Sequence, residues 1–361
     1  MKRKKALLYD PYLDVMGGGE KHILSVLQVL ENEGYEVNIA WDKDLTDELK
    51  QKLNIEFKSL HFVQNVFQGK SILQSVTNLH NIDVFLYVTD GSYFFSHAKN
   101  NYVFSMYPKK ELYNLTFLNR LKLWNYKFIS NSHFTHDRLK SLGISSKVIY
   151  PYIDSVFLNQ DLKILRKDKT ILNVGRFFRQ LHAKRQDVAI DMFIALMERL
   201  PELKDYSLIL AGGVKDKDDK LYLDELQKKA QEYPNIIFKP NIPFSELLGL
   251  YQHASYYWHF AGFGIDENKE PDKVEHLGIT PLEAMACGAI TFCYAVGGPK
   301  EIIDNGKNGF LFTSQNQLLD EMKKVISSEK LQDEIKISAQ KYIQDTFSYQ
   351  HFEKEVKETI L

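Results

Sequence analysis

Short runs of hydrophobic and β-branched residues alternate with longer amphipathic segments along almost the whole chain, and this alternation constrains the fold more than any other feature. The pattern is typical of βαβ units, whose strands lie parallel in one sheet. The strands expected in the first half are residues 6–10, 37–41, 83–88, 101–106, 127–131 and 147–151. A second series is expected at residues 170–175, 207–213, 235–240, 255–260, 289–295 and 309–313. Two series of strands predict two α/β domains.

The chain has 361 residues, 44% of them hydrophobic, which is enough for two cores of medium size. A boundary is expected within residues 150–170, where a proline and a charged, poorly periodic run interrupt the alternation. The formal net charge of −1 gives no long-range attraction to polyanions, so nucleic acid is not an expected partner. The two cysteines, Cys287 and Cys293, stand among apolar residues, as is typical of reduced thiols in a cytoplasmic protein. No run has the length and composition of a signal peptide or a membrane span.

Three successive glycines, Gly17 to Gly19, stand between the first expected strand and an amphipathic helix that is expected to stop near Gly34. Successive glycines let backbone N–H groups approach a phosphate, and a helix N-terminus adds a partial positive charge. The stretch is either an anion cradle or a flexible turn. Because it matches neither GxGxxG nor the phosphate loop of NTPases, a dehydrogenase or an ATPase is disfavoured.

Arg176 immediately follows the first strand of the second series, in the loop where open α/β sheets bind ligands. Lys184 and Arg185 come at the start of the next helix, so several cations are expected near one strand end. A diphosphate needs such charge for its binding and for stabilisation of the negative charge that develops as it leaves. A solvated basic loop is the alternative.

Glu275 and Glu283 are separated by seven residues and bracket a Gly-Ile-Thr-Pro turn. Thr280 suits the N-cap of a helix, Pro281 its first position and Glu283 its third, so that a capping box alone explains Glu283. It explains neither Glu275 nor Gly278. Carboxylates beside a helix N-terminus are suited to accepting hydrogen bonds from sugar hydroxyls while backbone amides hold phosphate oxygens.

Nearly the whole chain resembles the retaining GT-B glycosyltransferases, specifically glycosyltransferase family 4. The motifs that carry the resemblance occur in order: GGGEKH, NVGRFFRQLHAKRQD, WHFAGFG, EHLGITPLEAMACGAI with its two glutamates in the E-x7-E spacing, and VGGPKEII. The resemblance implies the GT-B fold, in which two Rossmann-like domains face each other across a donor and acceptor cleft. The implied parts are an acceptor-side domain at 1–155, a nucleotide-sugar domain at 156–340, and a helix at 341–361 that crosses back to the first domain.

The resemblance also implies the site residues. Glu283 would bind the ribose, Glu275 would contact the hydroxyls of the donor sugar, and Arg176 and Lys184 would hold the diphosphate. Glu275, Arg176 and Lys184 are therefore the expected catalytic residues, with Arg185 competing for the role of Lys184. Further donor contacts are expected from glycine-rich backbone and from the segment 239–244 near the base: Gly18, Gly19, Gly278, Ile279, Thr280, Asn241 and Ile242.

Family members of this kind use the nucleotide sugar as substrate, with no cofactor and no metal. The two D-x-D stretches, at residues 42–44 and 216–218, lie in lysine-rich contexts and are expected to be solvated turns. In the implied chemistry the anomeric carbon acquires oxocarbenium character and an acceptor hydroxyl attacks from the face that the diphosphate leaves. A leaving phosphate oxygen is a suitable base for the acceptor proton. The sequence shows no pair of catalytic carboxylates of the hydrolase kind.

Candidates for acceptor or sugar contact come from the first domain. Asp90 and Ser92 stand at the end of the strand expected at 83–88, and His97 is the candidate match for a histidine that many relatives carry. His259 lies between aromatic residues on a strand, where a histidine is more often a packed residue than a catalyst.

The segment 107–128 combines five cations and many aromatic residues with one acid, Glu111. Such a surface suits contact with anionic lipid and access to a lipid-linked sugar. The alternative is a helix that buries its aromatics in the core and exposes its lysines.

The expected function is transfer of a hexose from a UDP- or GDP-linked sugar to a glycan or lipid-linked glycan in surface polysaccharide biosynthesis. The expected place is the cytoplasm or the inner face of the membrane. The rival hypotheses are a nucleotide-sugar epimerase of the same fold and a sensor that binds a nucleotide sugar without catalysis.

Overall fold

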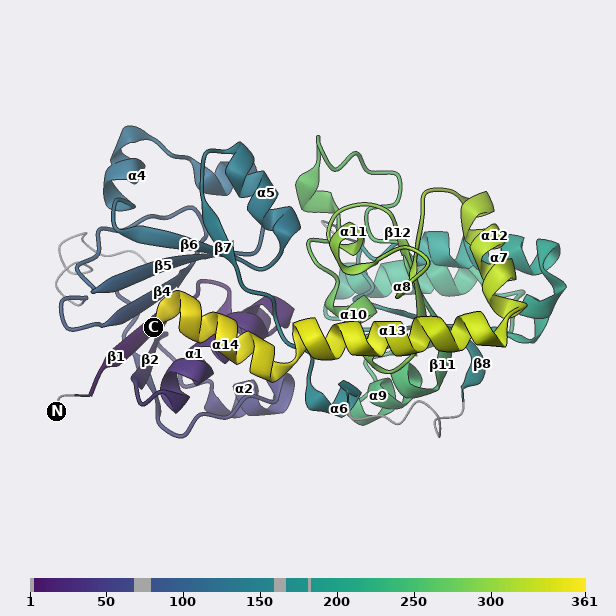
Figure 1. Cartoon of the computed structure of the whole chain (residues 1–361), viewed down its shortest axis with the longest axis horizontal. Helices are drawn as coiled ribbons and strands as arrows, with labels where there is room; N and C mark the ends of the chain where they lie inside the picture. The colour runs from purple at the N-terminus through teal and green to yellow at the C-terminus, as the bar shows by residue number, and fades with distance from the viewer. Residues whose placement is uncertain (1–2, 68–78, 159–166, 181–182) are drawn as a thin grey trace. The chain divides into compact units, whose positions relative to one another are not determined.

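The computed structural model describes residues 3–67, 79–158, 167–180 and 183–361. The chain divides into two compact units (Figure 1). Unit 1 consists of Met1–Tyr152 with Gln350–Leu361, and unit 2 consists of Ile153–Tyr349.

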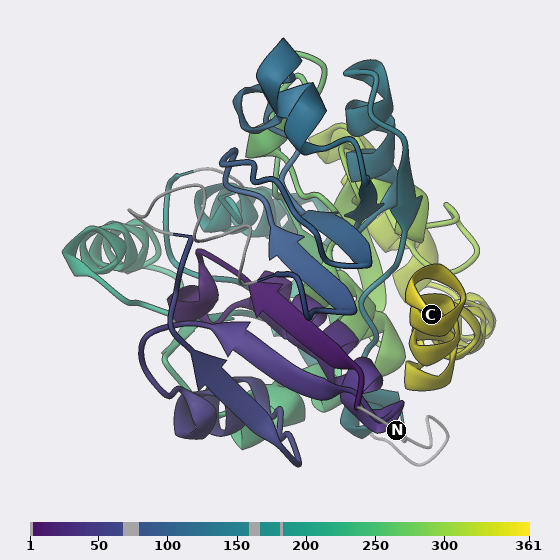
Figure 2. The ribbon, with the colours of Figure 1, turned by 90° about the vertical axis from the view of Figure 1, so that its left-hand side faces the viewer.

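Unit 1 is built on a seven-stranded parallel sheet in the order β3-β2-β1-β4-β5-β6-β7 (Figure 2). Its strands are β1 (Lys5–Tyr9), β2 (Glu36–Ala40), β3 (Leu60–Val63), β4 (Val84–Val88), β5 (Asn100–Ser105), β6 (Tyr126–Ser130) and β7 (Ser146–Val148). Its helices are α1 (Gly18–Asn32), α2 (Thr46–Leu53), α4 (Phe117–Lys122), α5 (His133–Ser141) and α14 (Tyr349–Ile360). The central strands β1 and β4 are buried almost throughout, as strands covered on both faces are.

The chain end is part of unit 1. Tyr102 of β5 donates its hydroxyl to the carbonyl of Thr359 at 3.1 Å. Lys357 forms an ion pair of 2.7 Å with Glu33, just after α1. The ring of His22 in α1 lies 5.8 Å from that of Phe352. These contacts fix α14 to the strand and helix layers of this unit.

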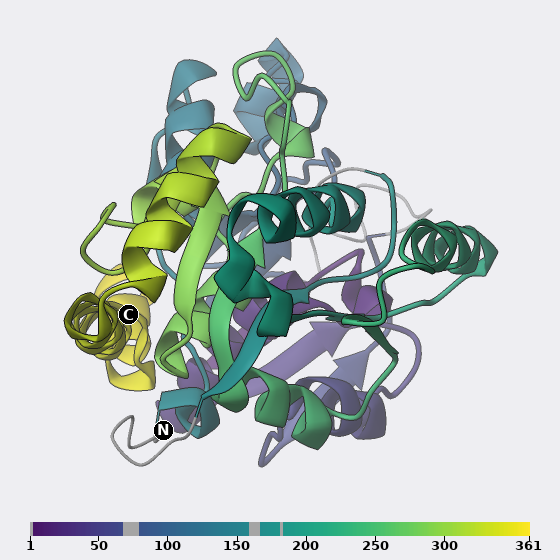
Figure 3. The ribbon, with the colours of Figure 1, turned by 90° about the vertical axis from the view of Figure 1, so that its right-hand side faces the viewer.

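Unit 2 is built on a six-stranded parallel sheet in the order β10-β9-β8-β11-β12-β13 (Figure 3). Its strands are β8 (Asp168–Val174), β9 (Ser207–Gly212), β10 (Ile236–Pro240), β11 (Ala254–His259), β12 (Ile290–Tyr294) and β13 (Phe310–Phe312). Its helices are α6 (Ser155–Leu158), α7 (Gln186–Arg199), α8 (Lys217–Lys229), α9 (Phe244–His253), α10 (Ile279–Ala286), α11 (Pro299–Ile302), α12 (Gln315–Ile326) and α13 (Glu329–Phe347).

The two faces of the unit 2 sheet are distinguished by strand alternation. On one face Tyr256 and Trp258 of β11 belong to the main core cluster, together with Phe193 of α7 and Leu318 of α12. The residue between them, Tyr257, points to the opposite face, where α9 and α10 lie. That second face carries the polar residues described below.

The strand order reverses once in each sheet, and ligands of open α/β sheets bind outside the carboxyl ends of the strands at such a point. In unit 1 the reversal lies between β1 and β4, and in unit 2 it lies between β8 and β11. The glycines at 17–19 follow β1, Asp90 follows β4, Arg176 follows β8 and Glu275 follows β11. Four of the predicted motifs therefore lie at the two reversals.

Every strand expected from the sequence is present, and the sheet of unit 1 contains one more, β3. β3 lies at the edge of the sheet, and its residues alternate between half-buried and exposed. Its sequence, LHFV, is mostly apolar but only four residues long, shorter than the runs of five to seven residues that indicated the other strands. Within the residues that the structure describes, no helix has both the length and the apolar character needed to cross a membrane.

Candidate active site

The candidate active site of unit 2 lies where β8 and β11 end side by side. The two strands are paired in parallel and end at Val174 and His259. The loop after β8 carries Arg176 and Lys184, and the loop after β11 carries Glu275. The pairing of β8 with β11 thus brings residues from distant parts of the sequence to one edge of the sheet.

Lys184, Glu275 and His259 form a compact polar cluster at this edge. Nζ of Lys184 donates to Oε2 of Glu275, and both side chains are only 13% exposed. The same oxygen lies 3.1 Å from Nε2 of the fully buried His259, although the alignment falls short of a full hydrogen bond. Burial lowers the pKa of His259 against the opposing influence of Glu275, so the imidazole is neutral near pH ~7. Two of the three predicted catalytic residues are therefore in contact.

Gly175 makes room for the lysine of this cluster. A Cβ atom on Gly175 would lie 2.2 Å from Cγ of Lys184, far inside van der Waals contact. The carbonyl of Gly175 accepts a hydrogen bond of 3.1 Å from the amide of Gln186, the first residue of α7. The loop is thereby tied to the start of the helix that follows it.

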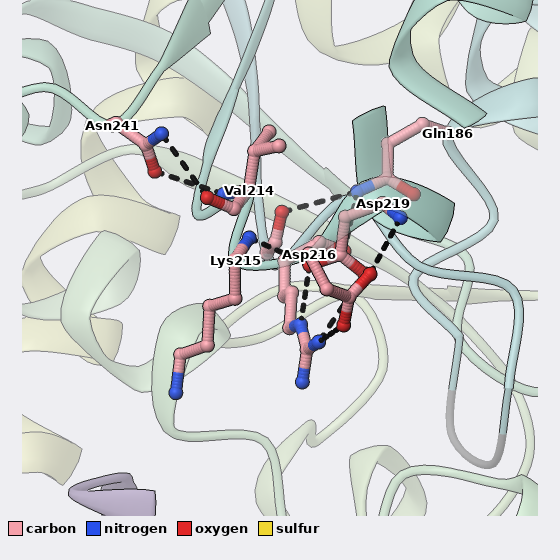
Figure 4. A network of polar contacts seen from close by, with 8 residues as sticks. Gln186, Val214, Lys215, Asp216, Asp219 and Asn241 are labelled. Atoms are coloured by element: carbon pink, nitrogen blue, oxygen red, sulfur yellow. Dashed lines mark hydrogen bonds and ion pairs between the residues drawn. The ribbon is translucent and has the colours of Figure 1, made fainter. Parts of the chain in front are cut away.

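Arg176, the third predicted catalytic residue, points toward the start of α8. Its Nε donates to Asp219 and its Nη2 to Asp216, each at 2.8 Å. Asp219 is almost fully buried, and although burial opposes its ionisation, the hydrogen bond from Arg176 holds its pKa below the usual value. Figure 4 shows Asp216 and Asp219 in this network. The side chain of Arg176 is 37% exposed, so two carboxylates orient it while part of it meets solvent.

The stretch 216–218, expected to be a solvated turn, is the start of α8. Asp216 is the N-cap, and its Oδ1 accepts a hydrogen bond of 2.9 Å from the backbone N–H of Asp219. In unit 1 the other D-x-D stretch also binds backbone, since the carboxylate of Asp42 accepts a hydrogen bond of 2.8 Å from the N–H of Asn65. Across the described ranges, no group of three or more His, Cys, Asp or Glu side chains is arranged to hold a metal ion.

Asn241 and Ile242, expected near the base of the donor, directly follow β10. Asn241 has a left-handed φ of 52°. Its side-chain oxygen accepts from the N–H of Val214 at 2.8 Å, and its amide donates to the carbonyl of Val214 at 3.2 Å (Figure 4). The side chain thus joins the loops after β9 and β10, and Ile242 beside it is half-buried. Contact of these residues with a base stays a prediction.

The helix α10 begins two residues earlier than expected, so the predicted capping box is wrong. Its N-cap is Gly278, with a φ of 108°, and a glycine has no side chain with which to cap the helix. Thr280 is the second helical residue and not the N-cap. Glycine adopts this positive φ readily because it has no Cβ atom, whereas other residues avoid it. The first N–H groups of the helix are therefore left to other partners.

The side chains of Thr280 and Glu283 each accept a hydrogen bond from a tyrosine. Tyr257 of β11 donates its hydroxyl to Oγ1 of Thr280 at 2.8 Å. Tyr251 of α9 donates its hydroxyl to Oε2 of Glu283 at 2.7 Å. Glu283 therefore accepts a hydrogen bond from Tyr251 within α10 and does not cap the helix.

Two glycines in the VGGPKEII motif fix the backbone at Glu275. The N–H of Gly298 donates to the carbonyl of Glu275 at 2.7 Å. A Cβ atom on Gly297 would lie 2.2 Å from that carbonyl oxygen, and one on Gly298 would lie 2.3 Å from Cα of Leu277. Only glycine allows the two chains to approach so closely.

In unit 1, Gly18 and Gly19 are the first residues of α1, whose N-cap is Gly17. Glu20 accepts a hydrogen bond of 2.6 Å from the N–H of Gly17. A Cβ atom on Gly19 would lie 2.7 Å from the sulfur of Met106. A side chain at position 19 would therefore need the end of Met106 to move, and phosphate contact at Gly18 and Gly19 stays a prediction.

Asp90 and Ser92 form a turn after β4. Oδ1 of Asp90 accepts from the hydroxyl of Tyr87 at 2.5 Å and from the N–H of Ser92 at 2.9 Å. His97 is exposed in the loop just before β5, at the amino ends of the parallel strands, so it is not a helix residue. The structure groups Asp90 with Ser92 and leaves His97 at the opposite edge of the sheet.

Sequence reasoning passed over Asp10, Asp219, Tyr251 and Tyr257. Asp10 is fully buried directly after β1, and burial with the neighbouring charge of Glu20 raises its pKa to about 7. Its position after a strand was a usable signal. Tyr257 stands two residues before His259 and therefore shares its face of β11, a second usable signal. Nothing in the sequence around Asp219 or Tyr251 indicates their partners.

Comparison with known proteins gives one family and several relatives. The family described as "Glycosyl transferases group 1" matches residues 156–342. The human GDP-Man:Man(3)GlcNAc(2)-PP-Dol alpha-1,2-mannosyltransferase is 30% identical over 244 residues, which are 62% of this chain and 46% of that protein. The chain thus spans about half the length of this relative. An alpha-1,3/1,6-mannosyltransferase of Dictyostelium discoideum is 27% identical over 62% of this chain and 57% of its own length.

Solved structures resemble the whole chain. A glycosyltransferase from Rickettsia africae matches with a TM-score of 0.73 and 17% identity, covering 100% of this chain and 98% of that one. HepE of Anabaena in complex with UDP-glucose matches with a TM-score of 0.69 and 17% identity, covering 99% of each chain. At these identities the likeness concerns the fold.

Proposed function

This chain belongs to the group 1 family of glycosyl transferases, with two Rossmann-like sheets of the GT-B fold, and from that premise we propose that it transfers a hexose. The donor is a nucleoside-diphosphate sugar and the acceptor a lipid-linked glycan that is assembled into a surface polysaccharide. The reaction retains the configuration of the anomeric carbon and requires neither a metal ion nor a cofactor.

The observation that carries this proposal is the Lys184–Glu275–His259 cluster at the strand reversal of unit 2. It places a cation and a carboxylate beside the N-terminus of α10, whose N-cap is a glycine. The cation and the helix end suit the phosphates of a donor, and the carboxylate suits the hydroxyls of a sugar. One site therefore offers complementary groups to both halves of a nucleotide sugar.

The roles follow from these charges. Lys184 and Arg176 stabilise the diphosphate as it leaves, which is where negative charge develops in the transition state. Glu275 accepts hydrogen bonds from the sugar, and Glu283 accepts them from the ribose. An oxygen of the departing phosphate takes the proton of the acceptor hydroxyl, which attacks from the same face. No residue of the chain needs to form a covalent bond to the sugar.

GDP-mannose is the first donor to test, because the human relative is named as a GDP-Man-dependent mannosyltransferase. UDP-glucose is the second, because HepE of Anabaena was solved with it. A one-hydroxyl difference between hexoses rests on single hydrogen bonds, so the panel must include several sugars with each nucleotide.

The acceptor side of the proposal rests on α4. This helix has no buried residue, and Figure 1 shows it at the periphery of unit 1. Phe117 is 79% exposed and Trp124, just beyond the helix, is 76% exposed. The alternative that the aromatics of this segment enter the core is wrong for these two residues.

Cations accompany the exposed apolar side chains of α4. Leu118 and Leu121 are also exposed, and Arg120 and Lys122 lie in the last turn of the helix. Within residues 107–128 Glu111 is the one acid in the sequence. Apolar side chains that insert among lipids and cations that meet anionic headgroups are the two elements of peripheral membrane binding. We therefore assign α4 to an anionic membrane surface, where a lipid-linked acceptor is found.

Transfer is tested by the release of UDP or GDP from hexose donors. Lys184→Met is expected to lower the rate at least tenfold, since it removes a cation from the departing diphosphate. Lys169→Met is the matched control, because Lys169 lies at the other end of β8 and is 61% exposed. Equal activity of the wild type and Lys184→Met would contradict the assignment of the site.

Membrane contact is tested by flotation with vesicles that contain phosphatidylglycerol. The double variant Phe117→Ser, Trp124→Ser is expected to lose most of the binding, and binding of the wild type is expected to weaken with salt. Ile337→Ser, a substitution at a residue of α13 that is 62% exposed, is the control. No flotation of the wild type at low salt would end this part of the proposal.

A further inference from the structure

Three aromatic side chains lie in a row beneath the candidate site. They are Tyr251 of α9 and Tyr257 and His259 of β11, and all three are fully buried. The rings of Tyr251 and Tyr257 stack with centroids 6.1 Å apart, and those of Tyr257 and His259 stack at 6.4 Å. We call this row the aromatic ladder.

Each member of the aromatic ladder contacts a different residue of the segment 275–283. The hydroxyl of Tyr251 lies 2.7 Å from Oε2 of Glu283. The hydroxyl of Tyr257 lies 2.8 Å from Oγ1 of Thr280. The imidazole Nε2 of His259 lies 3.1 Å from Oε2 of Glu275. One stack of rings therefore reaches both glutamates and the start of α10.

The fold explains why these groups can act as a unit. Tyr257 and His259 are two residues apart on one strand, so they share a face, and Tyr251 extends the row from the helix packed on that face. Stacked rings in a close-packed core cannot shift separately. A movement of one rung changes the positions available to the next.

The ladder also has defined protonation states. Burial raises the pKa of Tyr251 and of Tyr257 well above the ordinary value, so both phenols keep their protons and donate. Burial lowers the pKa of His259, which stays neutral and donates from at most one ring nitrogen. Tyr251 and Tyr257 thus donate hydrogen bonds to Glu283 and Thr280, and the neutral His259 lies 3.1 Å from Glu275, so that the ladder adds no charge.

We propose that Tyr251, Tyr257 and His259 are positioning residues of the donor site, each governing a different part of the donor. This inference rests on the proposed function and adds residues to it. Tyr251 sets the carboxylate of Glu283 for the ribose, and His259 sets that of Glu275 for the sugar. Tyr257 sets Thr280, at the helix end that faces the phosphates.

The division of labour predicts a split between binding and transfer. UDP and GDP contain the ribose and the phosphates but no hexose. Loss of the hydroxyl of Tyr251 should therefore weaken the binding of the nucleoside diphosphate itself. Loss of His259 should leave that binding unchanged and slow the transfer of the sugar. A purely structural role would move both quantities together with the unfolding temperature.

The experiment titrates UDP and GDP into the full chain by calorimetry and measures hexose release from the donor that the wild type uses. Tyr251→Phe is expected to weaken binding of the preferred nucleoside diphosphate about tenfold. His259→Phe is expected to bind it within about twofold of wild type and to lose at least about tenfold in kcat. His259→Gln, whose side-chain N–H can replace Nε2–H, is expected to recover part of that loss.

Tyr256→Phe is the matched control, because Tyr256 is equally buried on the same strand but packs on the other face, against Tyr206 and Phe292. It should change neither quantity. An active wild type whose Tyr251→Phe and His259→Phe variants behave like Tyr256→Phe would overturn the ladder and leave the proposed function standing. A wild type that neither binds UDP or GDP nor turns over any hexose donor would overturn the proposed function, and the ladder with it.

Discussion

Replacing Glu275 with glutamine should separate donor binding from sugar transfer. Glu275 is only 13% exposed, accepts from Nζ of Lys184 and lies 3.1 Å from His259. Glutamine keeps the shape of the side chain and removes its charge. The change therefore tests whether the carboxylate serves the sugar or serves only to hold the lysine.

The size of the effect follows from the contacts. A hydrogen bond to a charged group contributes about 1.5–3 kcal/mol. Since about 1.4 kcal/mol corresponds to a factor of ten, hexose transfer by Glu275→Gln should fall roughly 10- to 150-fold. Binding of UDP or GDP should not weaken, because these ligands lack the sugar. It should become up to about fivefold tighter, because Lys184 is no longer shared with a competing carboxylate in a partly desolvated site.

The assay pairs calorimetric titration of the nucleoside diphosphate with steady-state turnover of the hexose donor. Glu270→Gln is the control, since Glu270 lies in the same loop but is 43% exposed and paired with Lys273. A parallel loss of affinity and turnover in Glu275→Gln would refute the reasoning. It would mean that Glu275 acts by holding Lys184 in place and does not contact the sugar.

Three further predictions concern stability. Gly278→Ala places a side chain at a φ of 108° and should destabilise unit 2 by about 1–2 kcal/mol, seen as a lower unfolding temperature; an unchanged temperature would contradict the assigned conformation. Asp219→Asn should cost about 2 kcal/mol by weakening the fork with Arg176, whereas exposed Asp218→Asn should have no effect. The pKa of Asp10 rises from 3.8 to about 7 in the folded chain. The contribution of Asp10 to the stability of the fold is therefore fully present below about pH 3.8 and is lost as the pH rises through about 7. Asp10→Asn should therefore raise the unfolding temperature more at about pH 8 than at about pH 5, and the opposite order would contradict the burial argument.

The architecture was readable from the sequence because it depends on alternation that each segment carries by itself. The strand ends that position Arg176 and Glu275 followed from the same pattern, since parallel strands place their carboxyl ends at one edge. The strand β3, which is present but was not predicted, shows the limit of this signal. Its mostly apolar run of four residues, LHFV, is shorter than the runs that indicated the other strands.

The details of the site depended on contacts that sequence does not encode locally. The Thr-Pro pair suggested an N-cap at Thr280, but the N-cap is Gly278, with a positive φ, and the helix starts two residues earlier. Tyr251 and Asp219 act on residues 32 and 43 positions away, respectively. Such pairings can be predicted only when the strand order of the sheet is known, because that order decides which loops meet.

The central claim is transfer from a nucleotide sugar, and a panel of UDP- and GDP-linked hexoses offered to the full chain in the presence of a chelator tests it most directly. Binding is read from the shift in unfolding temperature, and turnover from the release of UDP or GDP. One donor is expected to be bound and turned over in the presence of the chelator. Failure of every donor to bind or to release its nucleoside diphosphate would contradict it.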